Sequence, residues 1–189
     1  RELNIPGEKE NLGKGVAYCP HCDGPFFKDK EVAVVGGGNS GVEAALDLSG
    51  IVNKVSIIEF MPKLKADQIL IDKVKQSDNI EIFTNTATKE IIHPNGKVEG
   101  ILCEDRGKKI DFEIKLSGVF VQIGLVPNSK FVDNILDLNQ FGEIVIDKNG
   151  NTSKEGIFAC GDVTTIPYKQ IVISMGEGAK TALSVADYL

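Results

Sequence analysis

The first third of the chain alternates short apolar runs with polar, glycine-containing turns. Residues 31–35 form a β-branched run that ends at a glycine cluster, residues 40–49 carry helix-forming side chains as far as Gly50, and residues 54–60 form another apolar run. This order predicts a buried strand, a tight turn, a helix and a second strand. It is the βαβ arrangement of an α/β fold with a parallel sheet.

The middle of the chain changes from this pattern to hairpins. A second amphipathic helix is expected after Pro62, and the apolar runs beyond it cover residues 80–83, 89–93, 98–104 and 110–115. Asn95-Gly96 separates two of these runs, and an Asn-Gly pair in that position predicts a tight turn. We therefore expect a third strand of the parallel sheet, followed by an antiparallel insert.

The last third contains one continuous apolar run, at residues 118–123, and two shorter ones at residues 143–146 and 156–159. All three predict strands. Residues 171–189 carry small and apolar side chains without a breaker at their end and predict a long final helix.

The composition is that of an ordinary globular protein of 189 residues, with 42% hydrophobic and 25% charged residues. This length suits one large domain or two small ones. We divide the chain into a linker at residues 1–14, a nucleotide-binding domain at residues 15–117 and a second domain at residues 118–189.

Charge and cysteine usage exclude several classes of protein. The net charge of −6 and the pI of about 5.0 argue against a nucleic-acid partner. The apolar runs are too short to cross a membrane, and no basic-then-apolar leader opens the chain. Four cysteines, two of them in a CxxC, favour a cytoplasmic redox protein over a secreted disulfide scaffold. Because the chain begins at Arg1 and not at a methionine, we expect it to be part of a longer polypeptide.

The turn after the first predicted strand reads Gly36-Gly37-Gly38-Asn39-Ser40-Gly41. A GxGxxG pattern between a strand and a helix is typical of a dinucleotide-binding loop. Gly36 would permit the tight turn, Gly38 would let the backbone approach a pyrophosphate, and Gly41 would allow helix and strand to pack closely. The free N–H groups at the helix start, from Asn39 and Ser40 onward, would face the phosphates. The alternative is a glycine-rich turn without a ligand.

Glu59 ends the second predicted strand, close to the spacing of about 20 positions after the glycines that the dinucleotide fingerprint requires. A carboxylate at this place can accept hydrogen bonds from ribose hydroxyls, and it would repel a 2′-phosphate. No arginine is near it in the sequence, and only Lys63 and Lys65 are close. We therefore expect NADH and not NADPH; the alternative is an exposed strand-end glutamate without a ligand.

A second candidate site, Cys19-Pro20-His21-Cys22-Asp23-Gly24, lies upstream of the glycine loop. A CxxC occurs in redox disulfides, zinc half-sites and thioredoxin folds. A zinc site needs further ligands, and Cys103 and Cys160 stand alone. A thioredoxin fold needs a long helix after the motif, and Gly24-Pro25 would end it. We interpret Cys19 and Cys22 as a redox disulfide.

Two side chains beside the cysteines are candidates for assisting this chemistry. A protonated His21 would stabilise a thiolate, and Asp23 is placed to move a proton as the disulfide opens and closes. Asp23 could equally be a turn residue. We expect Cys103 and Cys160 to be small buried hydrophobes. Because hydride does not add directly to a protein disulfide, a flavin between nucleotide and disulfide is also expected.

The two motifs, with Val42-Glu43 after the glycine loop, resemble the low-molecular-weight thioredoxin reductases and, more closely, the flavoprotein (F) subunits of bacterial alkyl hydroperoxide reductases. The resemblance covers the whole chain. It includes Gly118–Gly124 with Pro127-Asn128, Gly156–Asp162, Tyr168-Lys169-Gln170 and Gly176-Glu177-Gly178. It implies a Rossmann-like nicotinamide-binding domain with a parallel sheet and an antiparallel hairpin insert, followed by the C-terminal part of an FAD-binding domain.

The resemblance also implies roles for single residues. Cys22 would face the flavin, Cys19 would exchange with the next disulfide, and Asp23 would be the acid/base. Glu59-Phe60, in place of the basic pair of thioredoxin reductases, agrees with the NADH-using branch. Gly161, Asp162, Lys169 and Gln170 are implied for FAD, and Gly124 for NADH. The start of the final helix would lie near the flavin ring, where its positive dipole end favours negative charge.

The implied function is an NADH-dependent disulfide reductase. Electrons would pass from NADH to FAD, to the Cys19–Cys22 disulfide, and then to a thioredoxin-like domain or thioredoxin and a downstream peroxidase. Nicotinamide and dithiol would use the flavin by turns, which requires domain rotation, with Gly13–Gly15 and the region around Gly118 as candidate hinges. The full-length parent is expected to be a homodimer.

The sequence also departs from the family pattern. The family's first FAD-binding glycine motif and the thioredoxin-like domains of the peroxide-reductase branch are not in this sequence, so we expect the chain alone to bind NADH but to hold FAD weakly. One rival hypothesis is an NADPH-dependent thioredoxin reductase. Another, from a different class, is a nucleotide-binding module without turnover of its own.

Overall fold

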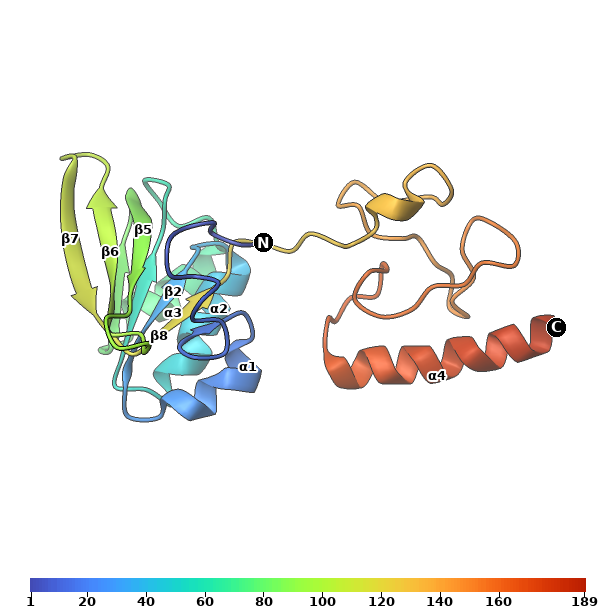
Figure 1. Cartoon of the computed structure of the whole chain (residues 1–189), viewed down its shortest axis with the longest axis horizontal. Helices are drawn as coiled ribbons and strands as arrows, with labels where there is room; N and C mark the ends of the chain where they lie inside the picture. The colour runs from blue at the N-terminus through green and yellow to red at the C-terminus, as the bar shows by residue number, and fades with distance from the viewer. The chain divides into compact units, whose positions relative to one another are not determined.

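The computed structural model describes residues 1–189 and divides into two compact units, Arg1–Gly124 and Leu125–Leu189. The first unit (Figure 1) is built on a five-stranded sheet. The order of its strands is β1-β8-β2-β3-β4, and all neighbouring strands are parallel. Its strands are β1 (Val16–Ala17), β2 (Glu31–Val35), β3 (Lys54–Ile58), β4 (Ile80–Phe83) and β8 (Gly118–Val121).

Two helices connect the middle strands of this sheet. α2 (Asn39–Ser49) runs from β2 to β3, and α3 (Gln68–Lys75) runs from β3 to β4. α2 begins directly after Gly38, one residue earlier than the apolar pattern predicts, and ends before Gly50 as predicted. The βαβ unit, the second helix and the third strand are therefore confirmed.

Alternate residues of the strands face two different cores. Val32 and Val34 of β2 belong to a core shared with α2 and α3, whereas Ala33 and Val35 belong to a core on the opposite face. That opposite face is covered by an antiparallel sheet of β5 (Thr86–Ile92), β6 (Gly100–Asp105) and β7 (Ile110–Lys115). The antiparallel insert is thus confirmed, and it closes the side of the parallel sheet that no helix covers.

Residues 1–14 are not a free linker but part of the first unit. Glu8 is only 1% exposed, and its carboxylate accepts hydrogen bonds from the backbone N–H groups of Leu3 and Asn4 at 2.9 and 2.7 Å. The hydroxyl of Tyr18 donates to the same carboxylate at 3.1 Å. Partial burial and then this hydrogen bond raise the pKa of Tyr18 to about 12. The buried carboxylate of Glu8 is therefore satisfied from both sides, by backbone N–H groups of the segment and by Tyr18.

The boundary between the units also differs from the expected one at residues 117 and 118. β8 lies between β1 and β2, and the N–H of Val119 donates to the carbonyl of Gly15 at 2.8 Å. A Cβ added at Gly118 would lie 2.2 Å from the ring of Phe27. Gly118 therefore starts a strand inside the sheet, and the boundary between the two units falls after Gly124.

The second unit is mostly irregular, with a short 3₁₀ helix η2 (Lys130–Val132) and the long helix α4 (Ile171–Tyr188). The expected strands at residues 143–146 and 156–159 are wrong, because they form only isolated bridges, at Ile144 and Phe158. The core is small, with Val132, Leu136 and Ile144 buried. Without neighbouring strands to complete a ladder, apolar alternation alone does not produce a sheet.

α4 confirms the predicted final helix, yet it buries only Thr181. Ile171, Val172 and Met175 in its first turns are 70–76% exposed. None of the helices in the structure combines the length and the apolar character that a bilayer crossing requires.

Candidate functional site

Cys19 and Cys22 form a disulfide at the start of the short helix α1 (Pro20–Asp23), with their Cα atoms 5.3 Å apart. Cys19 is the extended N-cap residue, and its sulfur accepts a hydrogen bond from the N–H of Cys22 at 3.2 Å. Pro20 suits the first helical position, since that residue has no intrahelical N–H bond to lose. As whole residues, Cys22 is exposed and Cys19 is half-buried.

The imidazole of His21 is directed toward α2. Its Nε2 lies 3.1 Å from Oδ2 of Asp47, and both side chains are more than half exposed. Protonated His21 would therefore gain only a weak ion pair here. Asp23 follows the disulfide, and its N–H donates to the carbonyl of Cys19 at 3.0 Å. Its half-buried side chain caps no helix, which leaves the carboxylate without a structural hydrogen bond.

The three glycines of the fingerprint meet different surroundings. Gly36 has φ +121°, and a Cβ there would lie 2.2 Å from the carbonyl oxygen of Gln122. A Cβ at Gly41 would lie 1.9 Å from the carbonyl oxygen of Gly36. At Gly38 a Cβ would have nothing within 4 Å. Gly36 and Gly41 are thus required by the fold, whereas Gly38 faces open space.

The start of α2 is open to a ligand. Gly38 is its N-cap and offers no side chain to the first N–H groups. Asn39 and Ser40 are exposed. The side chain of Asn39 bonds to Asp67, accepting from its N–H at 2.8 Å and donating to its carboxylate at 3.1 Å. At Asn39 the backbone N–H, and not the amide side chain, is therefore available to an anion, and this helix end fits a pyrophosphate.

Glu59 is 8% exposed at the end of β3, and its two carboxylate oxygens accept the N–H groups of Gly37 and Met61, both at 2.6 Å. A carboxylate oxygen has two lone pairs, so each can still accept a further hydrogen bond, as from a ribose hydroxyl. No arginine lies near Glu59 in the sequence, but the fold brings one to Phe60, the residue that follows it. The Cζ of Arg106 lies 3.7 Å from the centroid of the Phe60 ring.

Sequence spacing contains no sign of this arginine, because it belongs to the turn between β6 and β7. Lys63 and Lys65, the cations near Glu59 in the sequence, form no ion pair in the structure. Gly124 closes the first unit with φ +95° and open space at its Cβ position.

The glycine loop and the disulfide lie at opposite ends of α2. The loop precedes its first residue, and Asp47, the partner of His21, lies in its last turn. Its 11 residues span about 16 Å at 1.5 Å per residue. A nucleotide phosphate at the loop is therefore far from the disulfide.

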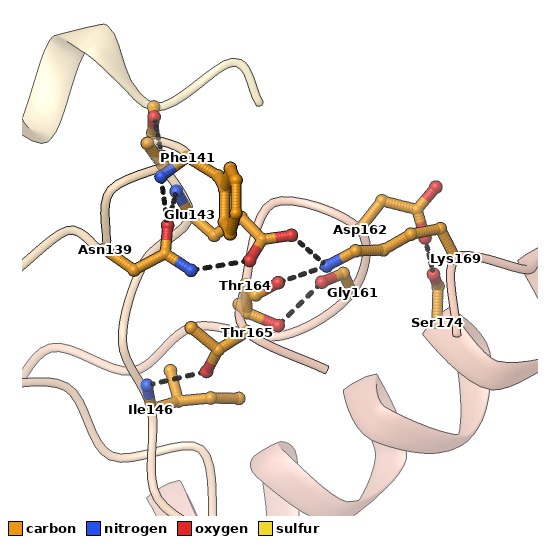
Figure 2. Close-up of polar contacts among 12 residues, drawn as sticks. Asn139, Phe141, Glu143, Ile146, Gly161, Asp162, Thr164, Thr165, Lys169 and Ser174 are labelled. Atoms are coloured by element: carbon orange, nitrogen blue, oxygen red, sulfur yellow. Dashed lines mark hydrogen bonds and ion pairs between the residues drawn. The ribbon is translucent and has the colours of Figure 1, made fainter. Parts of the chain in front are cut away.

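The second unit contains the residues expected to hold FAD, and Figure 2 shows three of them, Gly161, Asp162 and Lys169. Gly161 has φ +77°, and its carbonyl accepts the hydroxyl of Thr164 at 2.7 Å. Asp162 is exposed and accepts the hydroxyl of Ser174, on the first turn of α4, at 2.7 Å. Gln170 is the exposed N-cap of α4 and makes no capping bond with its side chain. Gly161, Asp162 and Gln170 thus gather at the open start of α4 and fit one part of a flavin site.

Lys169 points instead into the second unit. Its Nζ lies 2.9 Å from Oε1 of Glu143 and also donates to the carbonyl of Thr164 (Figure 2). Asn139 donates to the other oxygen of Glu143 at 2.7 Å. The hydrogen bond from Lys169 is the main cause that lowers the pKa of Glu143. Lys169 therefore stabilises the loop that carries Asp162.

Of the two other cysteines, Cys103 is fully buried, and burial raises the pKa of its thiol to about 12. Cys160 is only partly buried. The expectation of buried hydrophobes holds for Cys103 alone.

Comparison with known proteins agrees with this geometry. A family model described as pyridine nucleotide-disulphide oxidoreductase matches residues 1–183. Over all 189 residues the chain is 56% identical to a protein of Ferdinandcohnia aciditolerans named NADH dehydrogenase and 52% identical to the alkyl hydroperoxide reductase F subunit of Escherichia coli. It covers 36% of each, so the chain spans about a third of these relatives.

Solved structures show the same likeness. Thioredoxin reductase from Streptococcus pyogenes superposes with a TM-score of 0.92 at 34% identity, over 100% of this chain and 61% of that one. The thioredoxin reductase of Giardia duodenalis gives 0.88 at 30% identity, over 100% of this chain and 62% of that one. The resemblance inferred from the two motifs is confirmed.

Proposed function

Because the chain belongs to the pyridine nucleotide-disulphide oxidoreductase family, we propose that it supplies the nicotinamide-binding and redox-disulfide parts of an NADH-dependent flavoprotein disulfide reductase. One observation carries the proposal. A single compact unit holds both the Cys19–Cys22 disulfide and a glycine loop whose Gly38 faces open space.

The residues of the chain divide the work. Opening the Cys19–Cys22 bond consumes two electrons and two protons and yields two thiols. A bound flavin would accept hydride from the nicotinamide and deliver the two electrons to the disulfide. Cys22 would receive them, and the free carboxylate of Asp23 would hold or release the proton. Cys19 would then attack the disulfide of the partner.

The nucleotide would be NADH. The pyrophosphate would lie at the start of α2 beside Gly38, and the ribose hydroxyls would donate to Glu59. The carboxylate of Glu59 accepts hydrogen bonds from the backbone N–H groups of Gly37 and Met61, which hold it in place. Its negative charge would repel a 2′-phosphate.

The acceptor would be a thioredoxin-like domain that passes electrons to a peroxidase. Relatives named as the F subunit of alkyl hydroperoxide reductase support this choice, and the thioredoxin reductase structures support free thioredoxin as the alternative acceptor. In the parent protein we propose a homodimer in the cytoplasm, where thiols are kept reduced and a reversible CxxC can cycle.

Titration calorimetry with NADH and NADPH, followed by a diaphorase assay with added FAD, tests the proposal. We expect one NADH bound per chain, weaker binding of NADPH, and NADH oxidation that depends on FAD. A strong preference for NADPH would instead indicate a thioredoxin reductase. Nucleotide binding without FAD-dependent oxidation would indicate a module without turnover.

A further inference from the structure

The side chain of Arg106 has few partners in the protein itself. A guanidinium carries five N–H donors, and Arg106 uses one, from Nη1 to the carbonyl of Phe60 at 2.9 Å. It forms no ion pair. The nearby carboxylate of Asp105 accepts the N–H groups of Gly107 and Lys108 at 2.9 and 3.1 Å and so is bound within its own turn. Arg106 therefore keeps most of its donors for another group.

Backbone hydrogen bonds from the antiparallel insert hold residues 59–61, which follow β3 and include Phe60. The N–H of Thr86 donates to the carbonyl of Glu59 at 2.9 Å, and the N–H of Asn85 donates to that of Met61 at 2.8 Å. The backbone N–H of Arg106 in turn donates to the carbonyl of Asn85 at 2.9 Å. The antiparallel insert thereby holds Arg106 and Phe60 together at the carboxyl end of β3.

This pair forms a flat surface next to Glu59. Phe60 remains 53% exposed although Arg106 lies over its ring, so the pair keeps surface that a ligand can reach. In a nucleotide bound at the glycine loop, the base is attached to the ribose that Glu59 would hold. Bases pack on aromatic rings and on guanidinium planes because each offers a flat polarisable face.

We propose that Arg106 is a specificity-determining residue for the nucleotide, forming with Phe60 the surface on which the adenine packs beside Glu59. The inference rests on the proposed function, since it assigns a contact within the same nucleotide site. Arg106 contributes its planar group and not only its charge.

Titration calorimetry of the full chain with NADH and with ADP-ribose tests the assignment. Arg106→Ala should weaken both ligands by the same factor, about 10-fold, because both carry the adenosine half. Arg106→Lys should lose most of the same affinity, since it keeps the charge but not the plane. Lys108→Ala is the matched control, because it removes a cation from the same turn without touching Phe60. It should bind NADH and ADP-ribose as tightly as the unsubstituted chain does.

A direct readout separates contact from indirect support. With ADP-ribose bound, nuclear Overhauser contacts should join the adenine H2 proton to ring protons that disappear in Phe60→Leu. Unchanged affinity in Arg106→Ala, full affinity in Arg106→Lys, or bound ADP-ribose without these contacts would overturn the assignment and leave NADH binding intact. Failure of the parent chain to bind either ligand would refute the proposed function as well.

Discussion

Gly38→Ala should separate nucleotide binding from folding. A Cβ at this position meets nothing within 4 Å, and the backbone, at φ −81° and ψ −177°, suits any residue. Alanine is a poorer N-cap than glycine by about 0.5–1 kcal/mol, and the loss of glycine's freedom in the unfolded chain offsets about 0.4–1 kcal/mol. The free energy of unfolding should therefore change by less than about 0.5 kcal/mol.

The added methyl group would nevertheless stand where the pyrophosphate approaches the loop. We expect the affinity for NADH to fall at least about 10-fold, which corresponds to roughly 1.4 kcal/mol. Calorimetric titration measures the binding, and thermal unfolding measures the stability.

Gly41→Ala is the matched control, because its Cβ would lie 1.9 Å from the backbone oxygen of Gly36. Overpacking of this kind costs about 1–3 kcal/mol, so the Tm should fall by several degrees, roughly 5 °C. A Gly38→Ala protein that is as stable as the parent and binds NADH equally well would refute the location of the pyrophosphate at this loop.

Three further predictions concern stability and reactivity. Because Lys169 lowers the pKa of Glu143 below its ordinary 4.5, the pair stabilises the fold above that pH and loses this contribution as the pH falls through the lowered value. Lys169→Met should therefore cost about 1 kcal/mol at pH 7 and flatten the loss of stability on acidification, measured by denaturant unfolding; an equally steep loss in the variant would contradict the pairing. At pH 8, iodoacetamide should modify Cys160 in the folded chain and spare Cys103, whose pKa is raised to about 12 by burial. Mass spectrometry measures the labelling of each cysteine, and faster labelling of Cys103 would contradict the prediction. Thr181→Val should raise the stability by about 1 kcal/mol, since the buried hydroxyl has no hydrogen-bond partner, and a lower Tm would show that it has one in solution.

The fold of the first unit was accessible to sequence reasoning where local pattern and burial agree. β4 and β7 have the predicted bounds, and α2 begins one residue earlier than predicted. These elements form where they are predicted because each apolar run packs in a completed sheet or core. The runs around Ile144 and Phe158 have the same pattern but no neighbouring strands, so they stay irregular. Strand formation depends on partners that a local pattern does not contain.

The candidate site shows the same division. The disulfide and the glycine loop follow from residues close together in sequence. The contact of Arg106 with Phe60 could not be predicted in this way, because the antiparallel insert brings the two residues together. The burial of Glu8 could not be predicted either, because its donors Leu3 and Tyr18 lie on either side of it in a segment with the composition of a linker. Contacts that depend on tertiary packing cannot be predicted from a motif or from the spacing of residues in the sequence.

Anaerobic thiol counting tests the central claim most directly. The chain has four cysteines, of which Cys103 and Cys160 are free and two form the disulfide. After incubation with NADH and excess FAD, then denaturation, Ellman's reagent should find four thiols per chain, whereas NADH alone should leave two. The Cys19→Ser/Cys22→Ser variant should stay at two throughout. A count of two thiols in the unsubstituted chain after the flavin has been reduced would contradict electron transfer from NADH to this disulfide.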